Sequence, residues 1–147
     1  MKNKTLFGDS KLIVHTDGGS RGNPGAAALG VVVGDKEYGE YLGTHTNNYA
    51  EYMAVIFALK KAKALLGKTK AKEAEVEVRM DSELIVRQLA RKYKVLEPDL
   101  KPLFVDVLNL MMDFKKVEFK HIPREENKRA DRMVNKALDK KEKTGSA

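Results

Sequence analysis

The chain has 147 residues, 42% of them hydrophobic and 33% charged, a balance typical of one soluble globular domain with a real core. It has no cysteine, which excludes a disulfide framework and a thiolate zinc site. No run approaches the roughly 20 apolar residues of a membrane-spanning helix, and the start MKNKTLFGDS lacks the apolar core of a signal peptide, so we expect a cytoplasmic protein. The net charge of +7 fits an acidic polymer as partner, although many basic proteins bind none.

The first part of the chain has the pattern of β-strands. Apolar runs predict strands over 12–16, 26–33 and 38–43, with a hairpin turn at 34–36 between the second and third. The stretch between the first two strands is rich in Gly and polar residues and predicts a loop, so that Asp17 ends the first strand. Three strands with short connections indicate an antiparallel meander.

A helix is predicted from Asn48, where the apolar period changes from two to 3.6. Its apolar stripe runs from Tyr52 to Leu66, and Gly67 is placed to end it. Glu51 lies on the buried edge of the predicted first turn.

The next unit is a strand followed by a helix. A charged connector, GKTKAKEAE, leads to a strand over 76–80, which ends on a second carboxylate, Asp81. Ser82 is a suitable N-cap for a helix that carries apolar residues as far as Tyr93. The geometry around Asp17 is thereby repeated.

Three further elements complete the chain. We predict a helix from near Asp99, a strand over 117–121 and a last helix from about Asn127, in which Asp131 points inward. The basic segment LDKKEKTGSA is expected to be a frayed, solvated extension of that helix. A meander followed by alternating strands and helices predicts a mixed α/β sheet with helices on its faces, in a single domain over 1–147 with its core at about 11–139.

Four carboxylates stand at comparable places in these elements: Asp17, Glu51, Asp81 and Asp131. Each alone has an ordinary explanation, because acids are favoured at helix N-termini and in turns. In open α/β sheets, however, strand ends and helix starts meet in one crevice. At about 4 Å and an effective dielectric of about 20, each like-charge pair costs about 4 kcal/mol, so such a cluster needs cations. Oxygen ligands favour Mg²⁺ or Mn²⁺ over zinc, and on a basic protein they indicate two-metal phosphodiester chemistry.

Four blocks of this sequence resemble, in order and content, the motif blocks of type 1 ribonuclease H: TDGGSRGNPG, TNNYAEYMAV, RMDSELIV and HIPREENKRADRMVNKAL. The resemblance spans about residues 11–139. It implies a ribonuclease H-like fold, with a five-stranded mixed sheet of three antiparallel and then two parallel strands and helices on both faces. It also implies hydrolysis of the RNA strand of RNA/DNA hybrids with two Mg²⁺ ions per site, or Mn²⁺ in their place, leaving 3′-hydroxyl and 5′-phosphate ends.

The resemblance assigns roles to single residues. It makes the four carboxylates and Gly18 the metal-binding residues, and it makes His121 a proton shuttle or an aid to product release. A histidine that merely ends a strand is the alternative for His121. The implied contacts to the hybrid are Gly19, Ser20, Asn23, Thr46, Asn47 and Asn48. Arg21 is a candidate contact to the nucleic-acid backbone, although a solvated loop position fits it equally well.

One departure from the family concerns substrate binding. Many bacterial members insert a basic, tryptophan-bearing handle before the helix near Asp99, whereas here only KVLEPD intervenes and tryptophan is absent. Hybrid binding is then expected to use other surfaces, such as Lys92, Lys94, Lys101 and the basic C-terminal tail, with weaker affinity or altered metal preference. A catalytically silent hybrid-binding module and another nuclease of the same fold remain as alternatives. We expect a monomer that needs no protein partner and no membrane.

Overall fold

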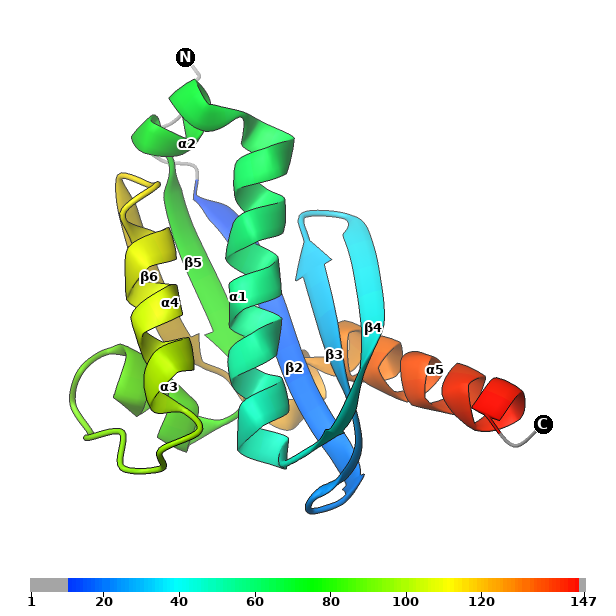
Figure 1. Cartoon of the computed structure of the whole chain (residues 1–147). Helices are drawn as coiled ribbons and strands as arrows, with labels where there is room; N and C mark the ends of the chain where they lie inside the picture. The colour runs from blue at the N-terminus through cyan, green and yellow to red at the C-terminus, as the bar shows by residue number, and fades with distance from the viewer. Residues whose placement is uncertain (1–10, 146–147) are drawn as a thin grey trace.

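The computed structural model describes residues 11–145, which form a five-stranded sheet flanked by helices (Figure 1). The strands are β2 (Leu12–Gly22), β3 (Gly25–Val33), β4 (Lys36–His45), β5 (Glu75–Met80) and β6 (Lys116–His121). Their order in space is β4-β3-β2-β5-β6, with antiparallel β4-β3-β2 pairing and parallel β2-β5-β6 pairing. The predicted mixed sheet is therefore confirmed. The predicted polar N terminus lies outside the described residues, and the single domain over 1–147 stays a prediction.

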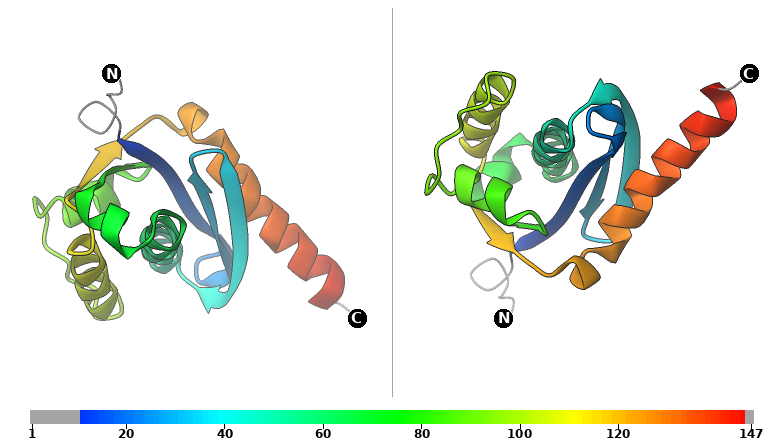
Figure 2. Two further views of the ribbon diagram at one scale, coloured as in Figure 1. Left: turned by 90° about the horizontal axis from the view of Figure 1, so that it is seen from above. Right: turned by 90° about the horizontal axis from the view of Figure 1, so that it is seen from below.

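Helices cover both faces of the sheet. They are α1 (Asn47–Leu66), α2 (Lys68–Glu73), α3 (Glu83–Leu89), α4 (Lys101–Met111) and α5 (Lys128–Gly145), with a 3-10 turn η1 (Arg124–Glu126) before the last. Figure 2 shows α1 and α5 on opposite faces, with α4 on the side of α1. Within residues 11–145, no helix has the length and apolar character that crossing a membrane requires.

The main core lies between α1 and the sheet. Thr46 caps α1, because its side chain accepts a hydrogen bond from the Tyr49 backbone nitrogen at 3.1 Å. The helix ends at Gly67, whose φ of 86° is in the left-handed region that glycine adopts without strain. The predicted stripe is buried from Tyr52 to Ala62, against apolar residues of β2, β3 and β5. Burial of this stripe fixes the rotation of α1 and so the direction of its first turns.

The strand β2 is longer than predicted, and this corrects the position of Asp17. It continues through Gly22 in an antiparallel hairpin with β3, in which Asp17 pairs with Gly30 and Gly22 with Gly25. Gly and Ser are weak strand formers, so the sequence predicted a loop here. The ladder to β3 overrides that local preference, and Asp17 lies in mid-strand.

Several helix boundaries also differ from the prediction. The charged connector contains α2, whose Ala71 is buried. The helix α3 ends at Leu89, so Tyr93 lies beyond it and is half exposed, after a left-handed Arg91. The helix α4 begins at Lys101, two residues after the predicted start near Asp99. The basic tail is helical as far as Gly145, where α5 ends.

The helix α5 lies directly on the sheet because small residues face it. A Cβ atom on Gly30 would lie 2.0 Å from the Ala130 carbonyl oxygen, so only glycine permits this approach. Beside it, Ala28, Val134 and Leu138 form a second small apolar cluster. This packing places the start of α5 next to the middle of β2, where Asp17 lies.

Candidate active site

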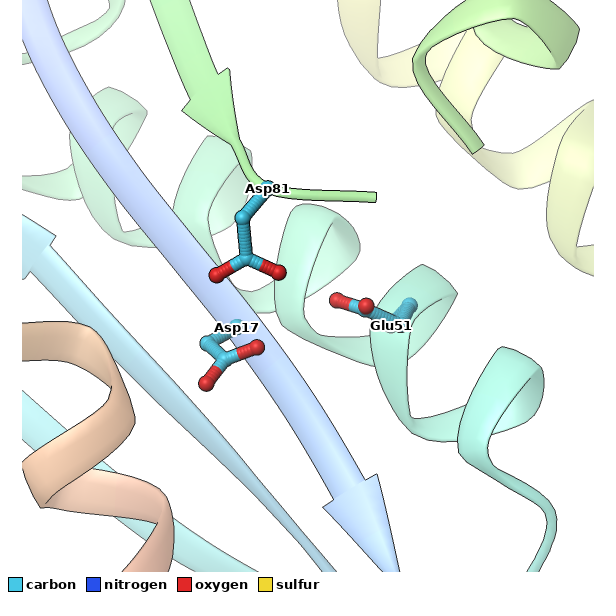
Figure 3. A group of neighbouring side chains, drawn as sticks. All are labelled: Asp17, Glu51 and Asp81. Carbon is cyan, nitrogen blue, oxygen red and sulfur yellow. The ribbon is translucent and has the colours of Figure 1, made fainter. Parts of the chain in front are cut away.

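Three acidic side chains from three elements meet where β5 ends beside the middle of the central strand β2. Asp17 projects from mid-strand β2, Asp81 directly follows β5, and Glu51 lies on α1, in its second turn rather than the predicted first. One carboxylate oxygen of each lies within 4.8 Å of the others. Figure 3 shows the three carboxylates turned toward one another. The structure thus brings together three of the four predicted metal ligands.

Asp131 approaches this cluster from the opposite face of the sheet. It lies in the first turn of α5, as predicted, but it is exposed rather than turned into the core. The side chain of Asp131 lines the same pocket as Asp17 and adds negative charge beside it. Asp131 is therefore a neighbour of Asp17 at the rim, outside the group of three.

Burial and mutual repulsion make the cluster unfavourable in its charged form. Asp17 and Glu51 are each only 8% exposed. Burial, followed by the charges of Asp81 and Asp131, raises the pKa of Asp17 to about 8. Burial, followed by Asp17 and Asp81, also raises the pKa of Glu51 well above its ordinary value. Burial and shared negative charge at this cluster therefore favour the binding of a cation.

Two groups partly oppose these shifts. The backbone amide of Gly18 favours the ionised forms of Asp17 and Glu51 and so lowers the pKa of each, and the Arg124 charge also favours ionised Glu51. The pKa of both acids stays raised despite these two groups. Converging carboxylate oxygens without nitrogen or sulfur donors match the preference of Mg²⁺ and Mn²⁺. The residues present therefore fit a hard divalent cation.

Around the acids lies an open pocket of about 410 Å³. Of the predicted substrate contacts, Gly19, Ser20 and Asn47 line it, whereas Asn23, Thr46 and Asn48 do not. The other polar residues that line it are Arg21, Ser82, Arg124 and Asn135. The pocket is thus acidic at its base and carries hydrogen-bonding groups and two arginines at its sides.

The predicted substrate residues form a connected network at the β2–β3 hairpin. The backbone nitrogen and hydroxyl of Ser20 donate to Asn47 Oδ1 at 2.8 and 3.1 Å, and the Asn47 backbone nitrogen donates to Asn23 Oδ1 at 3.0 Å. Asn48 lies apart and donates to Glu97 Oε1 at 3.0 Å. The network ties β2 to the start of α1, and it leaves the Asn47 amide nitrogen free of hydrogen bonds within residues 11–145.

Gly18 and Gly19 do not lie in the predicted loop. Both are strand residues, and Gly18 permits the close approach of β2 to the α1 backbone. His121 ends β6 beside Met80 and lines a separate pocket with Arg87 and Phe119. The structure therefore places His121 at the same end of the sheet as Asp81 but outside the acidic pocket.

Sequence reasoning missed one buried residue of the site, Asn127. It is 1% exposed, and its amide nitrogen donates to the Thr16 carbonyl oxygen at 2.9 Å and to Asp81 Oδ2 at 3.0 Å. Its position inside the HIPREENKRAD block was the available signal, but nothing in the block distinguishes it from an ordinary helix cap. Asn127 connects the start of α5 to two strands and orients Asp81.

The strand order and the acidic pocket together define a ribonuclease H-like protein. In agreement, the sequence profile of a family described as Reverse transcriptase-like matches residues 15–137. The LC11 ribonuclease H1, whose crystal structure is a complex with an RNA/DNA hybrid, is 49% identical with a TM-score of 0.83, and the match covers 88% of this chain and 98% of that one. The chain belongs to the type 1 ribonuclease H family.

Two curated relatives extend beyond the matched region. The Ribonuclease HI of Halobacterium salinarum is 42% identical over 135 residues, which cover 88% of this chain and 65% of that protein. A bifunctional protein of Mycobacterium tuberculosis is 40% identical over 136 residues, which cover 88% of this chain and 36% of that protein. The chain therefore spans less than two thirds of either relative.

Proposed function

We propose that this chain is a metal-dependent endoribonuclease that hydrolyses the RNA strand of RNA/DNA hybrids. The observation that carries the proposal is the cluster of Asp17, Glu51 and Asp81, whose oxygens lie within 4.8 Å of one another in an open pocket. Support for the substrate comes from the LC11 relative, whose structure contains such a hybrid. The products would carry 3′-hydroxyl and 5′-phosphate ends.

In this proposal the three clustered carboxylates and Asp131 hold two Mg²⁺ ions, or Mn²⁺ in their place, and the Gly18 backbone completes the set. When bound, the ions supply activation of the attacking water and stabilisation of the leaving oxygen. The chain itself positions the ligands: β2 and β5 fix Asp17 and Asp81, and Asn127 orients Asp81 through a hydrogen bond of 3.0 Å. His121 would transfer a proton or assist product release from outside the pocket.

Substrate recognition would use the hairpin network and a second basic surface. Asn47 lines the pocket, and its amide nitrogen is available to a base or a 2′-hydroxyl, the group that distinguishes RNA from DNA. In place of a handle, Lys92, Lys94 and Lys101 line one groove of about 480 Å³ with exposed Leu96. We assign this groove to the more distant backbone contacts of the hybrid.

One assay tests the function. Labelled RNA/DNA hybrid, double-stranded RNA and double-stranded DNA are incubated with Mg²⁺, Mn²⁺ or EDTA. We expect cutting of the RNA strand of the hybrid, loss of cutting in EDTA, and loss of cutting but not of binding in Asp17→Asn. Cutting of the DNA strand or cutting that survives EDTA would overturn the proposal. Binding without cutting by the unmodified protein would favour a silent hybrid-binding module instead.

A further inference from the structure

The guanidinium of Arg21 is held by three side chains of α5. Its Nη2 lies 2.8 Å from Asp139 Oδ1 and 3.2 Å from Asn135 Oδ1, and its Nη1 lies 2.5 Å from Glu142 Oε2. Positions four and three residues apart share one face of a helix. The three groups therefore form a single receptor for this arginine, which lies on β2 and not in the loop considered from the sequence.

This contact borders the acidic pocket. Arg21 lies four residues after Asp17 on β2 and, like Asn135, lines the pocket. The other arginine of the pocket, Arg124, makes no side-chain hydrogen bond or ion pair with any residue of 11–145. One of the two arginines at the pocket is thus available to an anion, whereas the other is already neutralised.

The ion pairs of Arg21 with Asp139 and Glu142 are weak enough for another anion to replace them. The side chains of Asp139 and Glu142 are 65% and 61% exposed, and exposed pairs of this kind change an equilibrium constant by only about 1.4- to 5-fold each. Glu142 also lies in the last turn of α5, where the helix dipole disfavours an acid. Helix stability therefore does not explain its presence, but the contact with Arg21 does.

We propose that Arg21 is a phosphate-binding residue of the hybrid site, and that Asp139 and Glu142 hold its guanidinium until a nucleic-acid phosphate replaces them. The inference rests on the proposed function. A phosphodiester carries the negative charge and the paired oxygens that a guanidinium binds in a bidentate manner. Without a polyanion, the two acids lower the positive potential at the pocket. Asp139 and Glu142 thereby reduce the affinity of the site for hybrids that make few other contacts with the protein.

The test measures binding of a labelled RNA/DNA hybrid in EDTA, so that cutting does not interfere. The variant Asp139→Asn/Glu142→Gln is expected to bind about 3- to 10-fold more tightly than the unmodified protein. The control Glu73→Gln/Asp106→Asn removes the same charge at exposed positions of α2 and α4, and it is expected to change affinity by less than about 2-fold. Thermal melting verifies that each variant is folded.

The same measurements in an Arg21→Gln background isolate the arginine. In that background, the gain in hybrid affinity caused by Asp139→Asn/Glu142→Gln should fall to the small change seen with the control variant. Arg21→Gln alone should reduce the slope of log affinity against log salt by about one. Arg21→Lys, which keeps the charge but not the planar fork, should restore the slope and only part of the affinity.

Two outcomes would overturn the inference alone. An equal gain with and without Arg21 would mean that the acids act by general repulsion. Weaker or unchanged binding by Asp139→Asn/Glu142→Gln would mean that the contact only anchors α5. If the unmodified protein neither binds nor cuts the hybrid, the proposed function fails as well, so the two failures are distinguishable.

Discussion

Gly18 and Ala50 touch through their backbones. A Cβ atom on Gly18 would lie 2.3 Å from the Ala50 carbonyl carbon, a distance that real Cβ contacts essentially never show. The contact occurs where β2 carries Asp17 and α1 carries Glu51, each one residue away. The separation of these two carboxylates is therefore set by a backbone contact, which no side-chain movement relieves.

Replacement of Gly18 by alanine is expected to disrupt this contact. Because the atoms in the way are backbone, Gly18→Ala should lower the free energy of unfolding by about 2 kcal/mol and weaken Mn²⁺ binding. Urea denaturation in EDTA and calorimetric titration with Mn²⁺ measure the two effects. Gly19→Ala is the control for stability, since its Cβ would meet only ordinary contacts, the nearest at 3.7 Å from Val134. A Gly18→Ala protein as stable as Gly19→Ala would contradict the role given to this contact.

The stability of the metal-free protein should fall as pH rises. The pKa of Asp17 is about 8 in the folded state and near its ordinary value of 3.8 when unfolded, so the folded state binds more protons between these values. Its stabilising effect is complete below about pH 4 and is lost as pH rises through about 8. Asp17→Asn should flatten this dependence and add about 2 kcal/mol of stability near pH 8 in EDTA. Urea denaturation across this range measures it, and Asp106→Asn should leave the slope unchanged.

Divalent cations should restore the stability that the metal-free protein loses as pH rises. Protons and metal ions compete for the same oxygens, so Mg²⁺ should raise the melting temperature more at about pH 8 than at about pH 5. Thermal melting with Mg²⁺ or EDTA at the two pH values gives the comparison. The difference should vanish in Asp17→Asn. An equal Mg²⁺ effect in that variant would place the stabilising ion elsewhere.

Substitutions of Asn127 should lower stability through its two hydrogen bonds, to Thr16 and to Asp81. Asn127→Ala removes a buried donor to Thr16 and Asp81 and should cost about 2 kcal/mol. Asn127→Asp puts a carboxylate oxygen against Asp81, so it should be less stable than Asn127→Ala near pH 7 and recover part of the difference near pH 4. Urea denaturation at both pH values measures this. The control is Asn109→Ala at an exposed position of α4, and no recovery in acid would argue against the contact with Asp81.

The role of His121 is open to a direct comparison with His45. His121→Ala should slow hybrid cleavage by about 100-fold without weakening Mn²⁺ binding, because it acts on protons rather than on the metal. His45 stacks on Tyr49 with ring centroids 3.9 Å apart and has no proposed part in the reaction, so His45→Ala should cleave normally. Cleavage rates across the pH range, together with calorimetry, separate the effects. Full activity of His121→Ala would leave it as a residue that merely ends a strand.

The fold followed from the sequence where burial alone determined it. The stripe from Tyr52 on α1 and the alternation in β5 predicted both elements, because each has one face against the core. The extension of β2 through Gly22 was not predictable, since its glycines form a strand only through pairing with β3. Likewise, α2 depends on the burial of a single alanine, Ala71.

The sequence predicted which residues form the site better than it predicted how they are arranged. Asp17 and Asp81 were placed together because each was predicted to end a strand. Asp81 does follow β5, whereas β2 continues past Asp17. The exposure of Asp131 could not be foreseen, because it depends on how α5 lies on Gly30. The contact between Arg21 and Glu142 joins residues 121 positions apart, and no local pattern encodes it.

The mid-strand position of Asp17 also bears on how quickly the site can load. Ladder partners flank this residue on both sides, from Val14 to Gly22, and its immediate neighbour rests against α1. An arriving cation therefore meets a ligand that is already held in place by strand pairing and by the contact with α1. The rate of loading should then be set by the exchange of water on the ion, and the protein should add no slow step of its own.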